Sequence, residues 1–235
     1  MTATQHWHEG AQLWRGGWAR FKTRWWLVLV IVQLGAAAVL LENGWDDRAL
    51  HAIRQPENQA LNQAAEQFYR WGDWAWSVPL AVLLWGAGTF FNRRRWRRLG
   101  WVCLWSFLVA SVAVNLFRAT LGRPRPRTGL ADGFYGLHLS GNDFHAFPSG
   151  HSAGSFATAT SVLSATPALS VPCAAYAVAV GWSRMQRNDH RPLDVLTGAA
   201  LGTFVGLCFG SALPGKHWRL RRKPRPLPDE EETQT

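Results

Sequence analysis

The chain has 235 residues, a formal net charge of +10 and a hydrophobic fraction of 48%. This length allows one domain with a sizeable core. The charge points to an anionic partner, which could be nucleic acid, a membrane surface or a substrate. The cysteines are Cys103, Cys173 and Cys208, and each lies inside an apolar run. This scattered, odd set argues against a disulfide framework and against a zinc site, and it favours buried free thiols.

The N-terminal part of the chain changes from polar to apolar at residue 25. Residues 1–24 are polar, aromatic and basic, and we predict a cytoplasmic tail; residues 25–41 are almost wholly apolar. A signal peptide with a cleavage site at Ala36-Ala37-Ala38 is an alternative, but the long preceding tail favours a retained membrane helix. Residues 42–73 carry apolar side chains at helical spacing, which predicts one or two short helices at the membrane interface.

Five more apolar runs follow, at 74–91, 99–117, 151–166, 168–182 and 193–213. Two of them are shorter than the roughly 20 residues that a spanning helix needs. In the last run, Gly198, Gly202 and Gly206 recur at four-residue spacing, which predicts a face that packs closely against another helix. We therefore expect an all-α, multi-pass membrane helix bundle with six transmembrane helices over residues 25–213.

The distribution of charge orients this bundle. With a cytoplasmic N-terminus, the inner segments are 1–24, 92–98, 166–168 and 214–235, and they hold more than half of the 25 Lys and Arg residues. The positive-inside rule requires such an excess. The last segment is basic, then acidic and proline-rich, and is expected to be disordered. A nucleic-acid patch at Arg93–Arg98 is the alternative, but no soluble binding module surrounds it.

The outer loops are then 42–73, 118–150 and 183–192, and two of them carry residues suited to phosphate. Arg118 is followed six residues later by Arg125-Pro126, and arginine can bind two phosphate oxygens at once. Further on, Pro148-Ser149-Gly150-His151 begins a helix whose N–H groups form an anion site. Taken alone, the first group could be a basic stretch that touches lipid headgroups, and the second could be an ordinary helix cap.

A third group lies on the last outer loop: Ser183-Arg184, then His190 and Asp194. Asp194 can accept a hydrogen bond from one imidazole nitrogen of His190, which leaves the other nitrogen as an unprotonated nucleophile. Alone, this group could be a solvated loop with a capping aspartate. However, a charged residue at the start of an apolar span is costly without a partner, and all three groups fall on one side of the membrane. We therefore expect an active site at the outer membrane face.

In order and spacing, the three groups resemble the signature of the type 2 phosphatidic-acid-phosphatase superfamily, in its integral-membrane lipid phosphatase branch. One position departs from the family pattern, because Arg118 stands where the family usually has Lys. The resemblance implies that His190 is a nucleophile that forms a phosphohistidine and that Asp194 orients it. It also implies that His151 protonates the leaving oxygen and then activates water. The implied phosphate-binding residues are Arg118, Arg125, Ser149, Gly150 and Arg184.

The resemblance implies no cofactor and no metal, because several arginines can neutralise a transferring phosphoryl group. The other polar residues of the 118–150 loop receive secondary roles. We expect His138 and His145 to be solvated or structural, and Arg123 and Arg127 to meet a headgroup or a second phosphate.

The predicted function is hydrolysis of a lipid phosphate or lipid pyrophosphate. Candidate substrates are phosphatidylglycerophosphate, phosphatidate, undecaprenyl pyrophosphate and the phosphate of lipid A, and the partners are this lipid and the bilayer, without nucleic acid. The alternatives are a vanadium-haloperoxidase-like enzyme and a non-catalytic protein that binds headgroups. The resemblance implies a bacterial inner membrane, and the charge distribution then predicts that both termini are cytoplasmic and that the site faces the periplasm.

Overall fold

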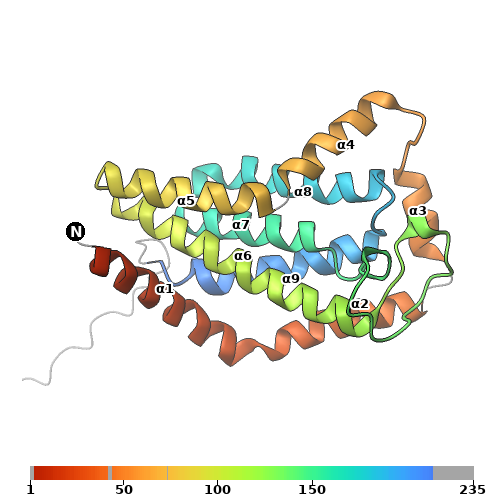
Figure 1. Cartoon of the computed structure of the whole chain (residues 1–235), viewed down its shortest axis with the longest axis horizontal. Coiled ribbons are helices and arrows are strands. Elements are labelled where there is room, and N and C mark those ends of the chain that lie inside the picture. The colour runs from red at the N-terminus through yellow and green to blue at the C-terminus, as the bar shows by residue number, and fades with distance from the viewer. Residues whose placement is uncertain (1–2, 42–43, 73, 214–235) are drawn as a thin grey trace, which may run out of the picture.

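The computed structural model describes residues 3–41, 44–72 and 74–213 of the chain, so the predicted C-terminal tail, 214–235, lies outside the described residues. The described part is all-α, as predicted: it contains α-helices and short 3₁₀ turns, and no strand beyond one isolated bridge between Arg123 and His145 (Figure 1).

Each of the six apolar runs forms a helix. These helices are α2 (Trp26–Leu41), α5 (Trp74–Phe90), α6 (Arg94–Leu121), α7 (Gly150–Ala165), α8 (Ser170–Gln186) and α9 (Pro192–Gly210). Among the described residues, α6 and α9 are long and apolar enough to cross a membrane. Helix α1 (Ala3–Arg24) and α2 are bent by 55° relative to each other, and together they could make a third span. Six transmembrane helices therefore remain a prediction.

The predicted N-terminal tail is instead largely helical. Helix α1 (Ala3–Arg24) packs against α6 and α9. Its Glu9 is buried, with Oε2 2.5 Å from Nε of Arg97 and Oε1 2.6 Å from Nε of Arg98. Buried charges are tolerated only when paired, so this ion pair attaches α1 to the start of α6. The segment that composition presented as a tail is part of the bundle.

The segment 42–73 contains two short helices, as expected: α3 (Trp45–Ile53) and α4 (Gln59–Trp71). Helix α4 begins at Asn58, whose side chain accepts a hydrogen bond from the backbone N–H of Leu61 at 3.1 Å. Such a cap satisfies one of the N–H groups that a helix start leaves open. Helix α4 packs along α8 (Figure 1), so this segment covers the end of the bundle where α8 finishes.

The glycine stripe on α9 packs against α7, as predicted. A Cβ added to Gly198 would lie 2.3 Å from the carbonyl oxygen of Ser149, and one added to Gly202 would lie 2.1 Å from that of Ala153. Only glycine allows the two backbones to approach this closely. The contact also sets the helix starts side by side, since the backbone N–H of Ser149 donates to the carbonyl of Asp194 at 2.9 Å.

We expect Gly202→Ala to destabilise the protein by about 1–3 kcal/mol, because the added methyl group must push α7 and α9 apart. The matched control is Gly86→Ala on α5, where an added Cβ meets nothing within 4 Å. That control should be neutral or stabilising by up to about 1 kcal/mol, since alanine favours helix. Thermal unfolding in detergent micelles measures both variants. Equal melting temperatures would contradict the close α7–α9 contact.

Candidate active site

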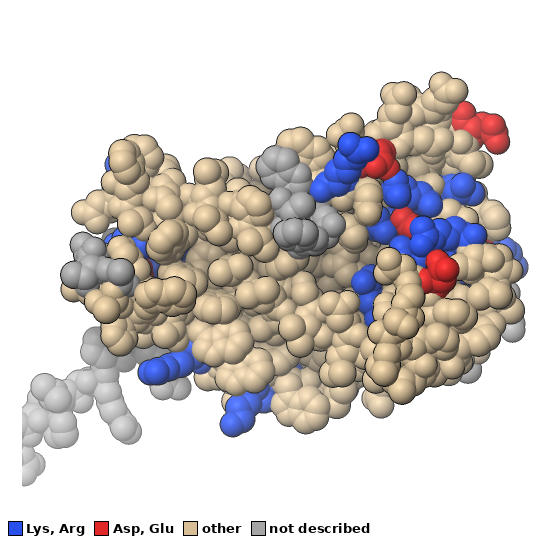
Figure 2. Space-filling view, in the orientation of Figure 1, with Lys and Arg blue, Asp and Glu red and all other residues tan. Residues whose placement is uncertain are grey.

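Charged side chains of both signs gather at one end of the bundle. Figure 2 shows Lys, Arg, Asp and Glu side by side below α4, whereas the middle of this face is largely free of charge. This is the end where the 122–149 loop lies, where α8 finishes and where α7 and α9 begin (Figure 1). The three sequence groups therefore meet at one place, because Arg118 ends α6, His151 begins α7, Arg184 ends α8 and Asp194 begins α9.

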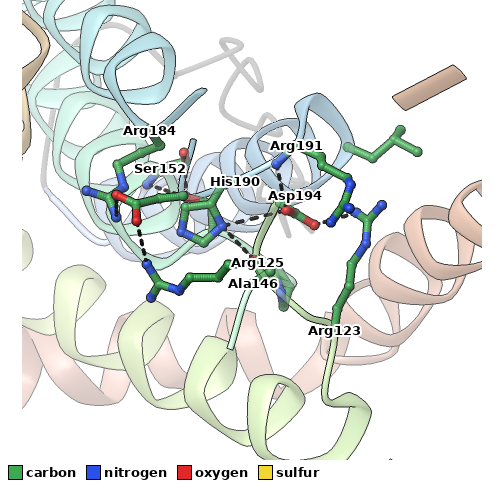
Figure 3. Close-up of polar contacts among 12 residues, drawn as sticks. Arg123, Arg125, Ala146, Ser152, Arg184, His190, Arg191 and Asp194 are labelled. Carbon is green, nitrogen blue, oxygen red and sulfur yellow. Dashed lines mark hydrogen bonds and ion pairs between the residues drawn. The ribbon is translucent and has the colours of Figure 1, made fainter. Parts of the chain in front are cut away.

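His190 lies in the short connection between α8 and α9 and is fully buried. Its Nδ1 is 2.7 Å from the carbonyl oxygen of Ala146 (Figure 3). A carbonyl can only accept, so Nδ1 carries the proton and Nε2 presents a lone pair. Burial, together with the neighbouring cations Arg184 and Arg125, holds the pKa of His190 well below its usual value. Nε2 is buried and has no hydrogen-bond partner among the described residues, so it is a neutral nitrogen available to a ligand.

Asp194 does not make the hydrogen bond predicted for it. Its Oδ2 lies 3.7 Å from Nδ1 of His190, which is beyond hydrogen-bond range. Instead Oδ1 lies 2.5 Å from Nη1 of Arg123, and Oδ2 accepts from the backbone N–H of Arg191 at 2.8 Å (Figure 3). Because the Ala146 carbonyl already occupies Nδ1, that carbonyl fixes the imidazole tautomer. Asp194 holds the start of α9 and places a negative charge near the ring.

Arg123 has a different role from the expected one. It is fully buried and its guanidinium contacts three carboxylates, those of Asp46 at 2.8 Å, Asp132 at 2.5 Å and Asp194 at 2.5 Å. Its Nε also donates to Asp132, at 2.8 Å. Its donors are thus used within the protein, and the expectation that Arg123 meets a headgroup or a second phosphate is wrong. Arg123 joins α3, the loop and α9 beneath the site.

Two of the predicted phosphate-binding arginines have donors with no acceptor among the described residues. They are Nη2 of Arg118 and both Nε and Nη1 of Arg184. Arg118 is oriented by its Nε, which donates to the carbonyl of Pro148 at 2.8 Å, and Arg125 by its Nε, which donates to the carbonyl of Asn142 at 2.7 Å. Buried donors are normally paired, so unpaired guanidinium donors near an unpaired imidazole nitrogen suit a bound oxyanion.

The start of α7 completes this set. Ser149 is the N-cap, and its Oγ accepts from the hydroxyl of Ser152 at 2.9 Å. A Cβ on Gly150 would lie 3.0 Å from Nη1 of Arg118, so glycine leaves room for the guanidinium at the helix start. The ring of His151 stacks on Tyr69, with centroids 5.2 Å apart. The helix N-terminus and the guanidinium of Arg118 are thus neighbours.

Tyr69 is a residue that the sequence analysis did not identify. Helix α4 brings it over the site, where the guanidinium carbon of Arg184 lies 4.6 Å from its ring centroid and that of Arg187 lies 4.1 Å away. Cations are attracted to an aromatic face at this range. The sequence holds no motif for this contact, because Tyr69 lies more than eighty residues before His151. Asp189, next to His190, is the other such residue.

The two histidines of the loop are structural, as expected. Nε2 of His145 is 2.8 Å from the carbonyl of His138, whose ring stacks on Phe144. Arg127 is half exposed and lies 3.3 Å from Asp143, and its expected contact with a headgroup or a second phosphate stays a prediction. Across the part of the chain that the structure describes, no group of three or more His, Cys, Asp or Glu side chains is arranged to hold a metal ion.

Comparison with known proteins gives three kinds of match. The model of the PAP2 superfamily matches residues 99–218. Two lipid A 1-phosphatases are similar: that of Rhizobium johnstonii is 27% identical over 219 residues, covering 82% of this chain and 87% of that protein. That of Rhizobium etli is 28% identical over 163 residues, covering 63% of this chain and 69% of that protein.

Two solved structures share the fold. One is a transmembrane PAP2 type phosphatidylglycerolphosphate phosphatase from Bacillus subtilis, with a TM-score of 0.61 and 24% identity over 78% of this chain and 92% of that one. The other is Aquifex aeolicus LpxE, with a TM-score of 0.55 and 25% identity. That match covers 69% of this chain and 92% of the LpxE chain.

Proposed function

This chain belongs to the PAP2 superfamily, and we propose that it is a bacterial membrane phosphatase that removes a phosphate from lipid A through a phosphohistidine at His190. The observation that carries the proposal is the buried, unpaired Nε2 of His190 among the unpaired donors of Arg118 and Arg184. The family and the similar proteins support a membrane lipid phosphatase, a phosphoric monoester hydrolase. Lipid A is the first candidate substrate because both similar curated proteins are lipid A 1-phosphatases.

The proposed first step is in-line transfer of the phosphoryl group to His190. Arg118, Arg125 and Arg184 hold the phosphoryl oxygens together with the N–H groups at the start of α7, where the helix dipole favours an anion. Nε2 of His190 attacks phosphorus while the bond from phosphorus to the lipid oxygen breaks. His151 gives its proton to that leaving oxygen. Positioning and charge neutralisation are the main requirements of phosphoryl transfer, and arginines held in place by hydrogen bonds and ion pairs supply both.

In the second step, water replaces the histidine. His151, now neutral, takes a proton from a water molecule, whose oxygen attacks phosphorus. The bond from phosphorus to Nε2 breaks, and inorganic phosphate leaves. The hydrogen bond from Nδ1 to the carbonyl of Ala146 supports both steps, because it keeps the lone pair on Nε2.

We further propose that the site faces the periplasm. The basic residues in 93–98 lie at the start of α6, which follows the end of α5 at the end of the bundle opposite the site (Figure 1). Clustered Lys and Arg favour the cytoplasmic side, so this arrangement directs the site outward. A lipid could then reach the arginines from the outer leaflet with its acyl chains still in the bilayer.

A panel of lipid phosphates tests the function. Purified protein in detergent micelles is given lipid A, phosphatidylglycerophosphate, phosphatidate and undecaprenyl pyrophosphate, and inorganic phosphate is measured. We expect lipid A to be turned over fastest, and mass spectrometry to show the loss of one phosphate, at the 1 position. Faster release of phosphate from another lipid would overturn lipid A as the proposed substrate. Release from none of them would favour a headgroup-binding protein, and halide oxidation with added vanadate would favour a haloperoxidase.

A further inference from the structure

Asp189 lies at the centre of the arginines around the site. Its side chain is only 3% exposed, and four guanidinium groups lie within ion-pair distance of its two oxygens. They belong to Arg184 at 2.9 Å, Arg125 at 3.2 Å, Arg187 at 3.3 Å and Arg127 at 3.4 Å. One carboxylate thus contacts two of the proposed phosphate-binding arginines and two others.

The four arginines form an inner and an outer pair. The inner pair, Arg125 and Arg184, is largely buried, whereas the side chains of the outer pair, Arg127 and Arg187, are 44% and 30% exposed. Each oxygen of Asp189 contacts one arginine of each pair: Oδ1 contacts Arg125 and Arg127, and Oδ2 contacts Arg184 and Arg187. The carboxylate therefore holds the two inner guanidinium groups in fixed positions relative to each other.

The contact also determines which donors remain for a ligand. Arg184 uses Nη2 on Asp189, and its Nε and Nη1 stay without an acceptor among the described residues. Arg125 uses Nη1 on Asp189 and Nε on the carbonyl of Asn142. Without the carboxylate, these flexible side chains would repel each other and could take other rotamers.

Asp189 also offsets part of the positive charge. Burial alone would raise its pKa, but the adjacent guanidinium groups of Arg184 and Arg125 hold the pKa of Asp189 below its usual value, so the side chain is ionised. A pocket of several arginines with no carboxylate would bind any phosphate strongly, including the product. Tight binding of product slows release and does not speed the chemical step.

We propose that Asp189 is a positioning residue, which fixes the guanidinium groups of Arg125 and Arg184 around the reacting phosphate and limits the affinity of the site for free inorganic phosphate. This inference rests on the proposed function for its effect on turnover. The effect on phosphate binding can be measured without any turnover.

The first variant, Asp189→Asn, removes the charge and keeps the shape. We expect kcat to fall about 100-fold, because the inner arginines lose their geometry. We also expect the dissociation constant of inorganic phosphate, measured by isothermal titration calorimetry, to fall on the order of tenfold. A side chain with only a structural role would lower turnover and phosphate affinity together, so that result would overturn the proposal. Unchanged values of both would overturn it as well.

The second variant, Asp189→Glu, keeps the charge and shifts the carboxylate by one methylene. Its kcat should be at least tenfold lower than that of wild type, while its affinity for inorganic phosphate stays within about twofold of the wild-type value. Turnover at the wild-type rate would overturn the positioning role. This variant also decides the matter if Asp189→Asn does not fold. The matched control is Asp143→Asn, whose side chain is 64% exposed and pairs with Arg127; both quantities should stay at their wild-type values.

The two proposals can fail separately. If wild-type protein releases phosphate from none of the lipids, the proposed function fails. The calorimetric comparison of wild type with Asp189→Asn still stands in that case, and equal or weaker phosphate binding by the variant then overturns the inference about Asp189.

Discussion

Replacing His190 with alanine should lower phosphate release by about 10⁴-fold or more, which is the scale of losing a nucleophile. The variant removes the imidazole whose buried Nε2 is the proposed nucleophile, close to Arg184, Arg125 and Arg118. Initial rates of phosphate release from lipid A in micelles measure the effect. Because the buried ring also donates to the carbonyl of Ala146, thermal unfolding must show that the variant remains folded.

The control for this variant is His51→Ala, on the exposed surface of α3, which should retain wild-type activity. A second readout is the intermediate itself: wild-type protein given a radiolabelled lipid phosphate should retain label after an alkaline quench, in which a bond between phosphorus and imidazole nitrogen survives. The His190→Ala variant should retain none. Turnover near the wild-type rate in His190→Ala would exclude His190 as the nucleophile.

Replacing Arg123 with alanine should destabilise the protein by about 3–5 kcal/mol, the usual cost of removing one partner of a buried ion pair. Arg123 is fully buried, and its loss leaves the carboxylates of Asp46, Asp132 and Asp194 without their shared cation. These aspartates come from α3, the loop and the start of α9, so the site would lose its support from three elements. The melting temperature in detergent, with inorganic phosphate absent, measures the effect.

Arg127→Ala is the matched control for Arg123→Ala. Arg127 lies in the same loop, but it is 44% exposed and its pair with Asp143 spans 3.3 Å. It also lies 3.4 Å from Asp189, but three other arginines pair with that carboxylate at shorter distances. Pairs of this kind contribute about 0–1 kcal/mol, so the melting temperature should barely change. If Arg123→Ala kept the wild-type melting temperature and instead lost affinity for phosphate, the assignment of Arg123 as a structural residue would be contradicted.

The helices could be predicted from the sequence because their signals are local. Each apolar run forms a helix, since burial of apolar side chains and backbone hydrogen bonding favour it regardless of distant residues. The glycine stripe of α9 was predicted for a similar reason, because Gly198 and Gly202 lie on one helix face whatever the partner is. Helix α1 was missed: its polar and basic composition resembles a tail, and only the distant Arg97 and Arg98 give its Glu9 a buried partner.

The grouping of the site residues was also predicted, but not their contacts. Order and topology place Arg118, His151, His190 and Asp194 at one end of the bundle. The acceptor for Nδ1 of His190 is a backbone carbonyl, at Ala146, and nothing in the type of a residue indicates which carbonyl will face a ring. The positions of Tyr69 and Asp189 likewise depend on how α4 and the α8–α9 connection pack.

The residue types and their spacing determine the chemistry available to this protein: histidines suited to the proposed phosphoryl and proton transfer, arginines suited to an anion, and apolar helices suited to a membrane. Which arginine does what is decided only by the tertiary structure. Arg118, Arg123 and Arg184 carry the same guanidinium group, yet Arg123 is surrounded by three carboxylates. Arg118 and Arg184 instead keep donors without acceptors among the described residues. A guanidinium binds whatever acceptors surround it, and those acceptors come from segments far apart in the chain.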